Sequence, residues 1–171
     1  MSLSRGLRPW TPPGEHDRLG RVGDRVGANN DLPSRDEQHA RKPVIAVFNS
    51  SSDTVDMLRT ALEGQGFQTV IGHIPEVKSG EFDFVEFIQD HAPAVIVYDI
   101  SPPYEANWTF PRLVRSSEPV KARQFIITTT NKPALDNLVG ETEAIEIIGK
   151  PYDLQRVVDA VRAALPPSSP A

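Results

Sequence analysis

The chain has 171 residues, no cysteine and a formal net charge of −5. This length suffices for the buried core of one ordinary domain. The lack of cysteine excludes disulfides, thiolate metal sites and cysteine nucleophiles, and the negative charge argues against a broad basic surface for nucleic acid. No apolar run reaches membrane-spanning length, and the first residues lack the apolar stretch of a signal peptide. We therefore expect a cytoplasmic protein that binds neither nucleic acid nor a membrane.

Both ends of the chain lack apolar periodicity. Residues 1–41 mix glycine, proline, asparagine, arginine and aspartate, a composition that cannot bury enough apolar surface to offset the entropy of ordering. Acidic residues are interspersed among the arginines of this segment, which favours a solvated tail over an arm that binds an anionic partner. We predict a disordered amino-terminal arm over 1–41, a folded domain over 42–165 and a flexible tail over 166–171.

The folded domain begins with two strands and two helices. An apolar run over 44–48 predicts a strand buried on both faces, and a second strand is predicted over 67–72. Helical spacing of apolar residues predicts a helix within 51–67, with Ser52 or Asp53 as its N-cap. Beyond a polar loop, the same spacing predicts a helix over 82–91. We assign to the core its three phenylalanines, Phe82, Phe84 and Phe87.

The alternation of strand and helix continues to the end of the domain. Pro111 falls within the next predicted helix, where it is acceptable in the first turn because proline lacks a backbone N–H. The remaining predicted strands cover 94–99, 124–129 and 144–149, and the remaining predicted helices cover 108–117, 133–140 and 153–165.

Five strands, each followed by a helix, predict an α/β fold with a parallel sheet covered on both faces. The economical arrangement is a flavodoxin-like (βα)5 three-layer sandwich with strand order 2-1-3-4-5. Ligands bind such sheets beyond the carboxyl ends of the strands, where strands 1 and 3 diverge. That edge would bring together Asp99, Thr128 or Thr129, and Lys150.

The segment 43–165 resembles the receiver domain of response regulators, of the chemotaxis type. VIVYDISPP resembles the phospho-acceptor motif, FIITT resembles the strand that ends in a hydroxyl residue, and EIIGKPYDLQRVVDAVRAAL resembles the end of the domain. The resemblance implies that Asp99 accepts a phosphoryl group. It also implies that Lys150 and Thr128, with Thr129 as the alternative, contact this group, and that the Lys150–Pro151 peptide is cis.

The sequence departs from the family pattern after the first strand. Receivers carry an adjacent acidic pair there that helps to bind Mg²⁺, whereas this chain has Asn49 and Ser50. Loss of two carboxylates lowers the affinity for a hard cation, so we expect a weak Mg²⁺ site at most. Its candidate ligands are Asn49, Ser50, Asp53, Asp99 and the carbonyl of Ser101; Asp53 could act through a water or serve instead as the helix N-cap.

Two other positions are unusual. An aromatic switch residue normally lies three positions before the lysine, where this chain has Ile147, which can pack but cannot change rotamer as an aromatic does. Tyr104 and Trp108 follow the candidate acceptor and form a candidate partner surface or roof for the site. The alternative for Trp108 is that it packs as an apolar residue of its helix.

Two functions compete. The first is a stand-alone response-regulator receiver in two-component phosphorelay signalling, phosphorylated on Asp99 by a sensor histidine kinase or phosphotransfer protein and acting through a downstream protein. The second is a phosphorylation-independent pseudo-receiver that serves as a protein-interaction module. An enzyme is not expected, because the sequence shows neither a glycine-rich phosphate loop nor a catalytic dyad.

Overall fold

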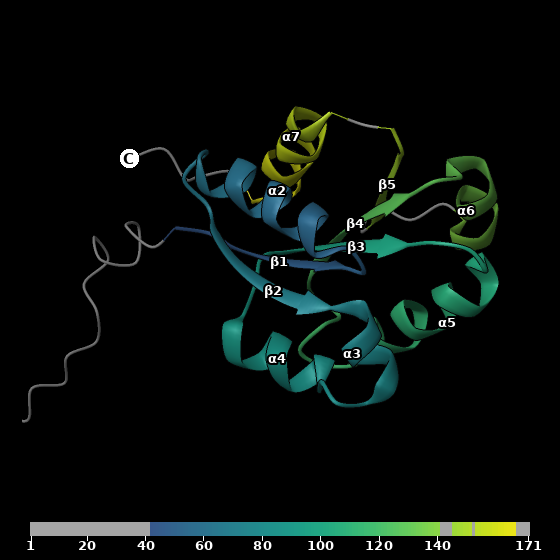
Figure 1. The fold of residues 1–171 in the computed structure, drawn as a ribbon. Helices are drawn as coiled ribbons and strands as arrows, with labels where there is room; N and C mark the ends of the chain where they lie inside the picture. Colours follow the sequence, from purple (N-terminus) through teal and green to yellow (C-terminus); the bar gives the residue numbers. More distant parts are fainter. Residues whose placement is uncertain (1–41, 141–144, 152, 167–171) are drawn as a thin grey trace, which may run out of the picture. The chain divides into compact units, whose positions relative to one another are not determined.

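A computed structural model describes residues 42–140, 145–151 and 153–166. Their five strands form one parallel sheet with the order β2-β1-β3-β4-β5, as Figure 1 shows. The predicted flavodoxin-like order is thereby confirmed. The strands are β1 (Val44–Asn49), β2 (Gln68–His73), β3 (Val95–Ile100), β4 (Gln124–Thr129) and β5 (Ile145–Gly149).

Helices cover both faces of the sheet. In Figure 1, α2 and α7 lie on one face, and α3, α4 and α5 lie on the other. The core contacts of Leu135 place α6 with the second group. The helices are α2 (Ser52–Glu63), α3 (Ile74–Ser79), α4 (Phe84–His91), α5 (Tyr104–Val114), α6 (Lys132–Val139) and α7 (Leu154–Ala164).

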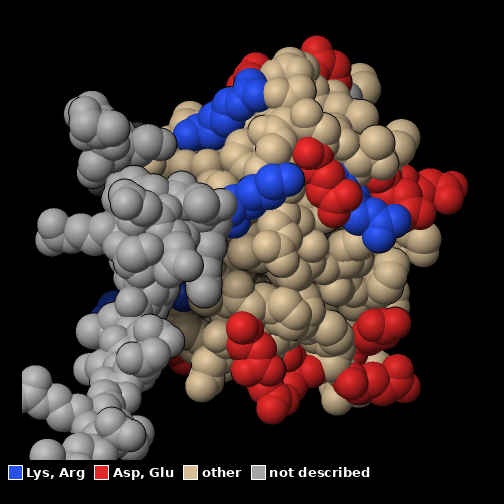
Figure 2. All heavy atoms as spheres, turned by 90° about the vertical axis from the view of Figure 1, so that its left-hand side faces the viewer, with Lys and Arg blue, Asp and Glu red and all other residues tan. Residues whose placement is uncertain are grey.

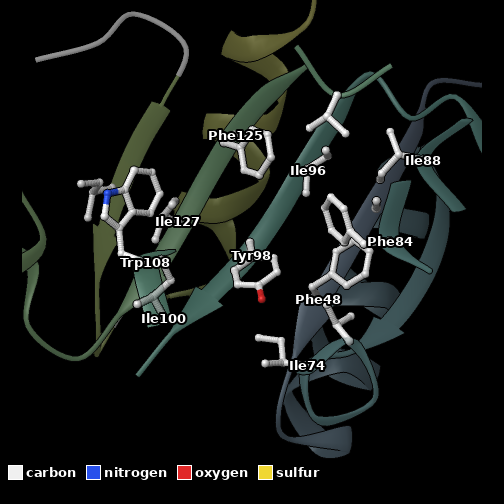
Figure 3. Close-up of a cluster of buried hydrophobic side chains, with 14 of the residues drawn as sticks. Phe48, Ile74, Phe84, Ile88, Ile96, Tyr98, Ile100, Trp108, Phe125 and Ile127 are labelled. Atoms are coloured by element: carbon white, nitrogen blue, oxygen red, sulfur yellow. The ribbon is translucent and has the colours of Figure 1, made fainter. Parts of the chain in front are cut away.

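The buried side chains form one cluster on each face of the sheet. Alternate residues of a strand point to opposite faces, so Phe48 joins the cluster under α3, α4, α5 and α6, while Val47 joins the cluster under α2 and α7. Figure 3 shows Phe48 beside Phe84, and their ring centroids are 4.8 Å apart. Phe82 and Phe87 pack against the same cluster, which confirms the core assignment of all three predicted phenylalanines.

Three local predictions were wrong. The N-cap of α2 is Ser51, whose hydroxyl accepts a hydrogen bond from the Thr54 N–H; the helix therefore starts at Ser52, and Asp53 lies in its first turn. The helix predicted from 108 begins at Tyr104, so Pro111 lies in its last turn. Proline has no N–H to donate to the carbonyl of Asn107, four residues earlier, so α5 forgoes that one backbone hydrogen bond.

The third wrong prediction concerns the polar loop after β2, which contains the short helix α3. It was missed because only Ile74 and Val77 are buried in it, too few to show a helical period. A proline at its start and Gly80 in the left-handed conformation at its C-cap are the signals that indicate it.

Some predictions lie outside the described residues. These are the disordered arm over 1–41 and, apart from Pro166, the tail over 166–171. None of the described helices is long and apolar enough to cross a membrane. On the face in Figure 2, the lysine and arginine side chains of the described residues are few and interspersed with acidic side chains, which lie at the top, on the right and at the bottom of the view. That face therefore offers no broad basic surface among the described residues.

Candidate functional site

Asp99 lies at the carboxyl edge of the sheet. At this point the connections that follow β1 and β3 lead to helices on opposite faces, α2 and α5. Asp99 is the last residue but one of β3, and it is only 5% exposed. A carboxylate buried to this degree must be compensated by hydrogen bonds or an opposite charge. Its immediate partners therefore define the chemistry of this edge.

Two side chains, one from β4 and one from the residue after β5, contact the same oxygen of Asp99. The ammonium of Lys150 lies 2.6 Å from Oδ1, and the hydroxyl of Thr128 donates a 2.7 Å hydrogen bond to the same atom. Lys150 follows β5 directly, and its peptide bond to Pro151 is cis, as the resemblance implied. The convergence of these three residues, predicted from the strand ends alone, is thus present in the structure.

The second oxygen of Asp99 makes one longer hydrogen bond. Oδ2 accepts a 3.2 Å hydrogen bond from the hydroxyl of Ser101. The backbone carbonyl of Ser101 accepts a 2.8 Å hydrogen bond from the side-chain amide of Asn107, whose Oδ1 in turn accepts a 2.8 Å bond from the ammonium of Lys78. A chain of hydrogen bonds thus connects Asp99 to α3 through α5.

A cavity of about 220 Å³ opens beside this chain of hydrogen bonds. Asp99 is the one acidic residue among those that line it, and Lys78 is the one basic residue. Sequence analysis missed Lys78 and Asn107, because neither lies at a strand end. The lining residues are Ser50, Ile74, Lys78, Tyr98, Asp99, Ser101, Pro102 and Asn107.

Tyr98 is the one tyrosine that lines this cavity. Figure 3 shows the phenol oxygen pointing toward Ile74, which also lines the cavity. Burial of the side chain, and next the negative charge of Asp99, raise the pKa of Tyr98 well above its usual range. The hydroxyl therefore keeps its proton at neutral pH.

The residues predicted to bind Mg²⁺ do not fit that ion. Oδ1 of Asn49 accepts a 2.9 Å hydrogen bond from the Ser51 N–H, and the buried Nδ2 of Asn49 is a donor without a partner among the described residues. Mg²⁺ requires oxygen ligands, preferably carboxylates, and the cavity supplies Asp99 as its one carboxylate together with the ammonium of Lys78. Asp53 does not line it. The weak metal site predicted from the sequence is therefore not supported by these side chains.

The surroundings of the other residues singled out in the sequence differ from one another. The hydroxyl of Thr129 faces away from Asp99 and accepts a bond from the Asn131 N–H, so Thr128 is the hydroxyl residue of the site. Trp108 is 6% exposed within the core, which supports the alternative that it packs as an apolar residue of its helix. Tyr104 is half-buried and lines a groove between α5 and α6. Ile147 packs in the core.

Solved structures with the same arrangement of strands and helices are receiver domains and related signalling proteins. The chemotaxis protein CheY4 of Vibrio cholerae aligns with a TM-score of 0.57 and 18% identity over 73% of this chain and 100% of its own. A response regulator from Thermotoga maritima aligns with a TM-score of 0.55 and 20% identity over 72% of this chain and 98% of its own. The chain has the fold of a response-regulator receiver domain.

A third similar structure is a sensor protein from a Polaromonas species, with a TM-score of 0.58 and 17% identity over 72% of this chain and 96% of its own. No protein-family model and no curated protein matches the sequence. At identities this low the likeness establishes the receiver fold alone. Its chemistry must be argued from the residues of this receiver-like domain.

Proposed function

We propose that the receiver-like domain is a signalling module that is phosphorylated on Asp99. The observation that carries this proposal is the contact of Lys150 and Thr128 with one oxygen of a buried carboxylate, at 2.6 and 2.7 Å. An ammonium neutralises charge on a transferring phosphoryl group, and a hydroxyl donates a hydrogen bond to it. These residue types, at the ligand-binding edge of this fold, match the requirements of phosphoryl transfer to a carboxylate.

The transfer needs little covalent chemistry from the protein. An oxygen of Asp99 attacks the phosphorus of the donor, an O–P bond forms, and the bond from phosphorus to the leaving group breaks. The leaving group, an imidazole of a phospho-histidine or the acetate of acetyl phosphate, keeps the electron pair. Oδ2 is the oxygen available for attack, because Oδ1 is already engaged by Lys150 and Thr128.

The partners that this function requires are proteins. A sensor histidine kinase or a phosphotransfer protein would supply the phosphoryl group, and a downstream protein would read the phosphorylated state. A net charge of −5 and the mixed charges of the face in Figure 2 favour protein partners over nucleic acid.

A second function is favoured by a different observation. Asn49 and Ser50 stand where an acidic pair would help to bind a metal ion, and the amide of Asn49 is tied to the Ser51 N–H. If the loss of that pair ended phosphoryl transfer, the domain would act as a pseudo-receiver, binding partners without phosphorylation. The Asp99–Lys150 pair would then be a purely structural ion pair.

Intact-mass spectrometry after incubation with acetyl phosphate distinguishes the two functions. The full chain is incubated both with Mg²⁺ and with a chelator, so that the result does not depend on the presence of a cation. We expect wild type to gain the mass of one phosphoryl group and Asp99→Asn to gain none. Lys150→Met should be labelled far more slowly than wild type, because it leaves the developing charge without its ammonium.

Serine and threonine phosphates survive alkaline hydroxylamine, whereas an acyl phosphate is cleaved by it. The added mass should therefore disappear on hydroxylamine treatment. Wild type that gains no mass under either condition, while remaining folded by circular dichroism, would reject phosphorylation and favour the pseudo-receiver.

A further inference from the structure

The cavity beside Asp99 has an unusual charge balance. Its lining includes one carboxylate, on Asp99, and one ammonium, on Lys78, and Lys150 adds a second ammonium bonded to Asp99. The three groups together carry one excess positive charge. A cavity built for a divalent cation would show the opposite sign, since such ions are held by clustered carboxylates.

Lys78 is held toward the cavity by a specific contact. Its ammonium donates to Oδ1 of Asn107 at 2.8 Å, and Nδ2 of Asn107 donates to the carbonyl of Ser101, also at 2.8 Å. Asn107 is therefore a positioning residue that ties α3 to the loop after β3. The bond from Asn107 also engages the Ser101 carbonyl, the candidate metal ligand of the sequence analysis.

Several groups at or beside this cavity can donate hydrogen bonds. Tyr98 presents a hydroxyl, Ser101 a hydroxyl and Lys78 an ammonium. Nδ2 of Asn49, at the end of the adjacent strand β1, is a buried donor without a partner among the described residues. Donors of this kind stabilise an oxyanion, and the positive charge of the Lys78 ammonium would repel a cation.

We propose that this cavity binds the oxyanion of a phosphoryl group without a divalent cation, and that Lys78 supplies the charge a metal ion would supply. This inference rests on the proposed function, because it concerns the group that Asp99 would carry. An acyl phosphate bears about two negative charges, and forming it removes the charge of the carboxylate. The ammoniums of Lys78 and Lys150 then balance the phosphoryl group with no metal ion present.

The binding of inorganic phosphate to the full-length Asp99→Asn variant tests the site separately from phosphoryl transfer. This variant cannot be phosphorylated on residue 99, and it matches the acyl phosphate in having lost the carboxylate charge. Phosphate is titrated in the presence of a chelator, and the side-chain amide of Asn107 is followed by NMR. We expect saturable binding that is unchanged within about twofold when Mg²⁺ is added, and that weakens as ionic strength rises.

Lys78→Met in the Asp99→Asn background should weaken phosphate binding roughly tenfold, because one charge-assisted hydrogen bond is lost. Lys121→Met is the matched control. It removes the same charge from an exposed lysine that precedes β4, at the opposite end of the strands, where it pairs with Glu118. This control should bind phosphate as tightly as its parent.

Ser50→Asp provides the converse test. Ser50 is exposed and lines the cavity, so a carboxylate can be placed there without burial. We expect this variant to bind phosphate more weakly in the chelator and to regain affinity when Mg²⁺ is added.

The outcomes separate the two proposals. Phosphate binding that requires Mg²⁺ in the Asp99→Asn parent, or that is unaffected by Lys78→Met, would overturn the cation-independent site. Wild type that is never phosphorylated by acetyl phosphate, combined with Lys78-dependent phosphate binding, would reject the proposed function while supporting the anion site. Phosphorylation of wild type that occurs with Mg²⁺ and fails in the chelator would support the proposed function and overturn the role of Lys78.

Discussion

Asp99 and Thr128 stand opposite each other in the register of β3 and β4, and the Thr128 hydroxyl donates a 2.7 Å hydrogen bond to Oδ1 of Asp99. Both side chains are almost completely buried. The pairing therefore positions a hydroxyl against a carboxylate by sheet register, without any contribution from a loop.

Thr128→Val should lower the free energy of unfolding by about 1–3 kcal/mol, because a buried carboxylate loses a hydrogen-bond donor. Thr128→Ser keeps the hydroxyl and should cost less. Urea unfolding measures both. Thr129→Val is the matched control, since the hydroxyl of this equally buried neighbour accepts only a 3.3 Å bond from a neutral backbone N–H. A loss for Thr128→Val no larger than for Thr129→Val would contradict the role of the pair.

Tyr98 should make the domain less stable at high pH. Burial, and then the charge of Asp99, raise the pKa of Tyr98 in the folded state, whereas an unfolded tyrosine loses its proton near pH 10. Above about pH 10 the unfolded state binds fewer protons than the folded state, so the free energy of unfolding falls as pH rises. Below that pH the contribution of Tyr98 is fully present.

Urea unfolding of wild type and Tyr98→Phe between about pH 8 and about pH 11 measures this effect. The wild-type curve should fall more steeply than that of Tyr98→Phe. Asp99→Asn should give an intermediate slope, because it removes the smaller cause of the shift and leaves burial in place. Parallel curves for wild type and Tyr98→Phe would show that this hydroxyl does not titrate differently in the two states.

Gly72 leaves the space that the Phe48 ring fills. The two residues are register partners in β1 and β2, and a Cβ on Gly72 would overlap that ring. Gly72→Ala should therefore destabilise the domain by about 1–3 kcal/mol through overpacking. Phe48→Leu should be less harmful in the Gly72→Ala background than in wild type, and a double-mutant cycle by urea unfolding measures that difference. Additive losses would mean that the ring moves aside freely.

The sequence contained most of the information for the fold and for three residues of the site. Its apolar runs are short and bounded by polar residues, which indicates strands buried on both faces, and helices between them require parallel pairing. Because all carboxyl ends of a parallel sheet lie at one edge, the sequence pattern alone predicts that Asp99, Thr128 and Lys150 lie together, as they do. Thr129 could not be excluded in this way, because only the register decides which of two adjacent hydroxyls faces Asp99.

Only the tertiary structure shows which charged side chains line the cavity beside Asp99. Lys78 lies on a six-residue helix with too few apolar positions to show a period, and it meets Asn107 across 29 residues of chain. That contact depends on how α3 and α5 pack beside β3, which no local pattern encodes. The sequence by itself thus determined the acceptor carboxylate with its lysine and threonine, since strand ends follow from hydrophobic pattern. The packing of α3 and α5 decided that an ammonium, rather than a second carboxylate, lines the cavity together with Asp99.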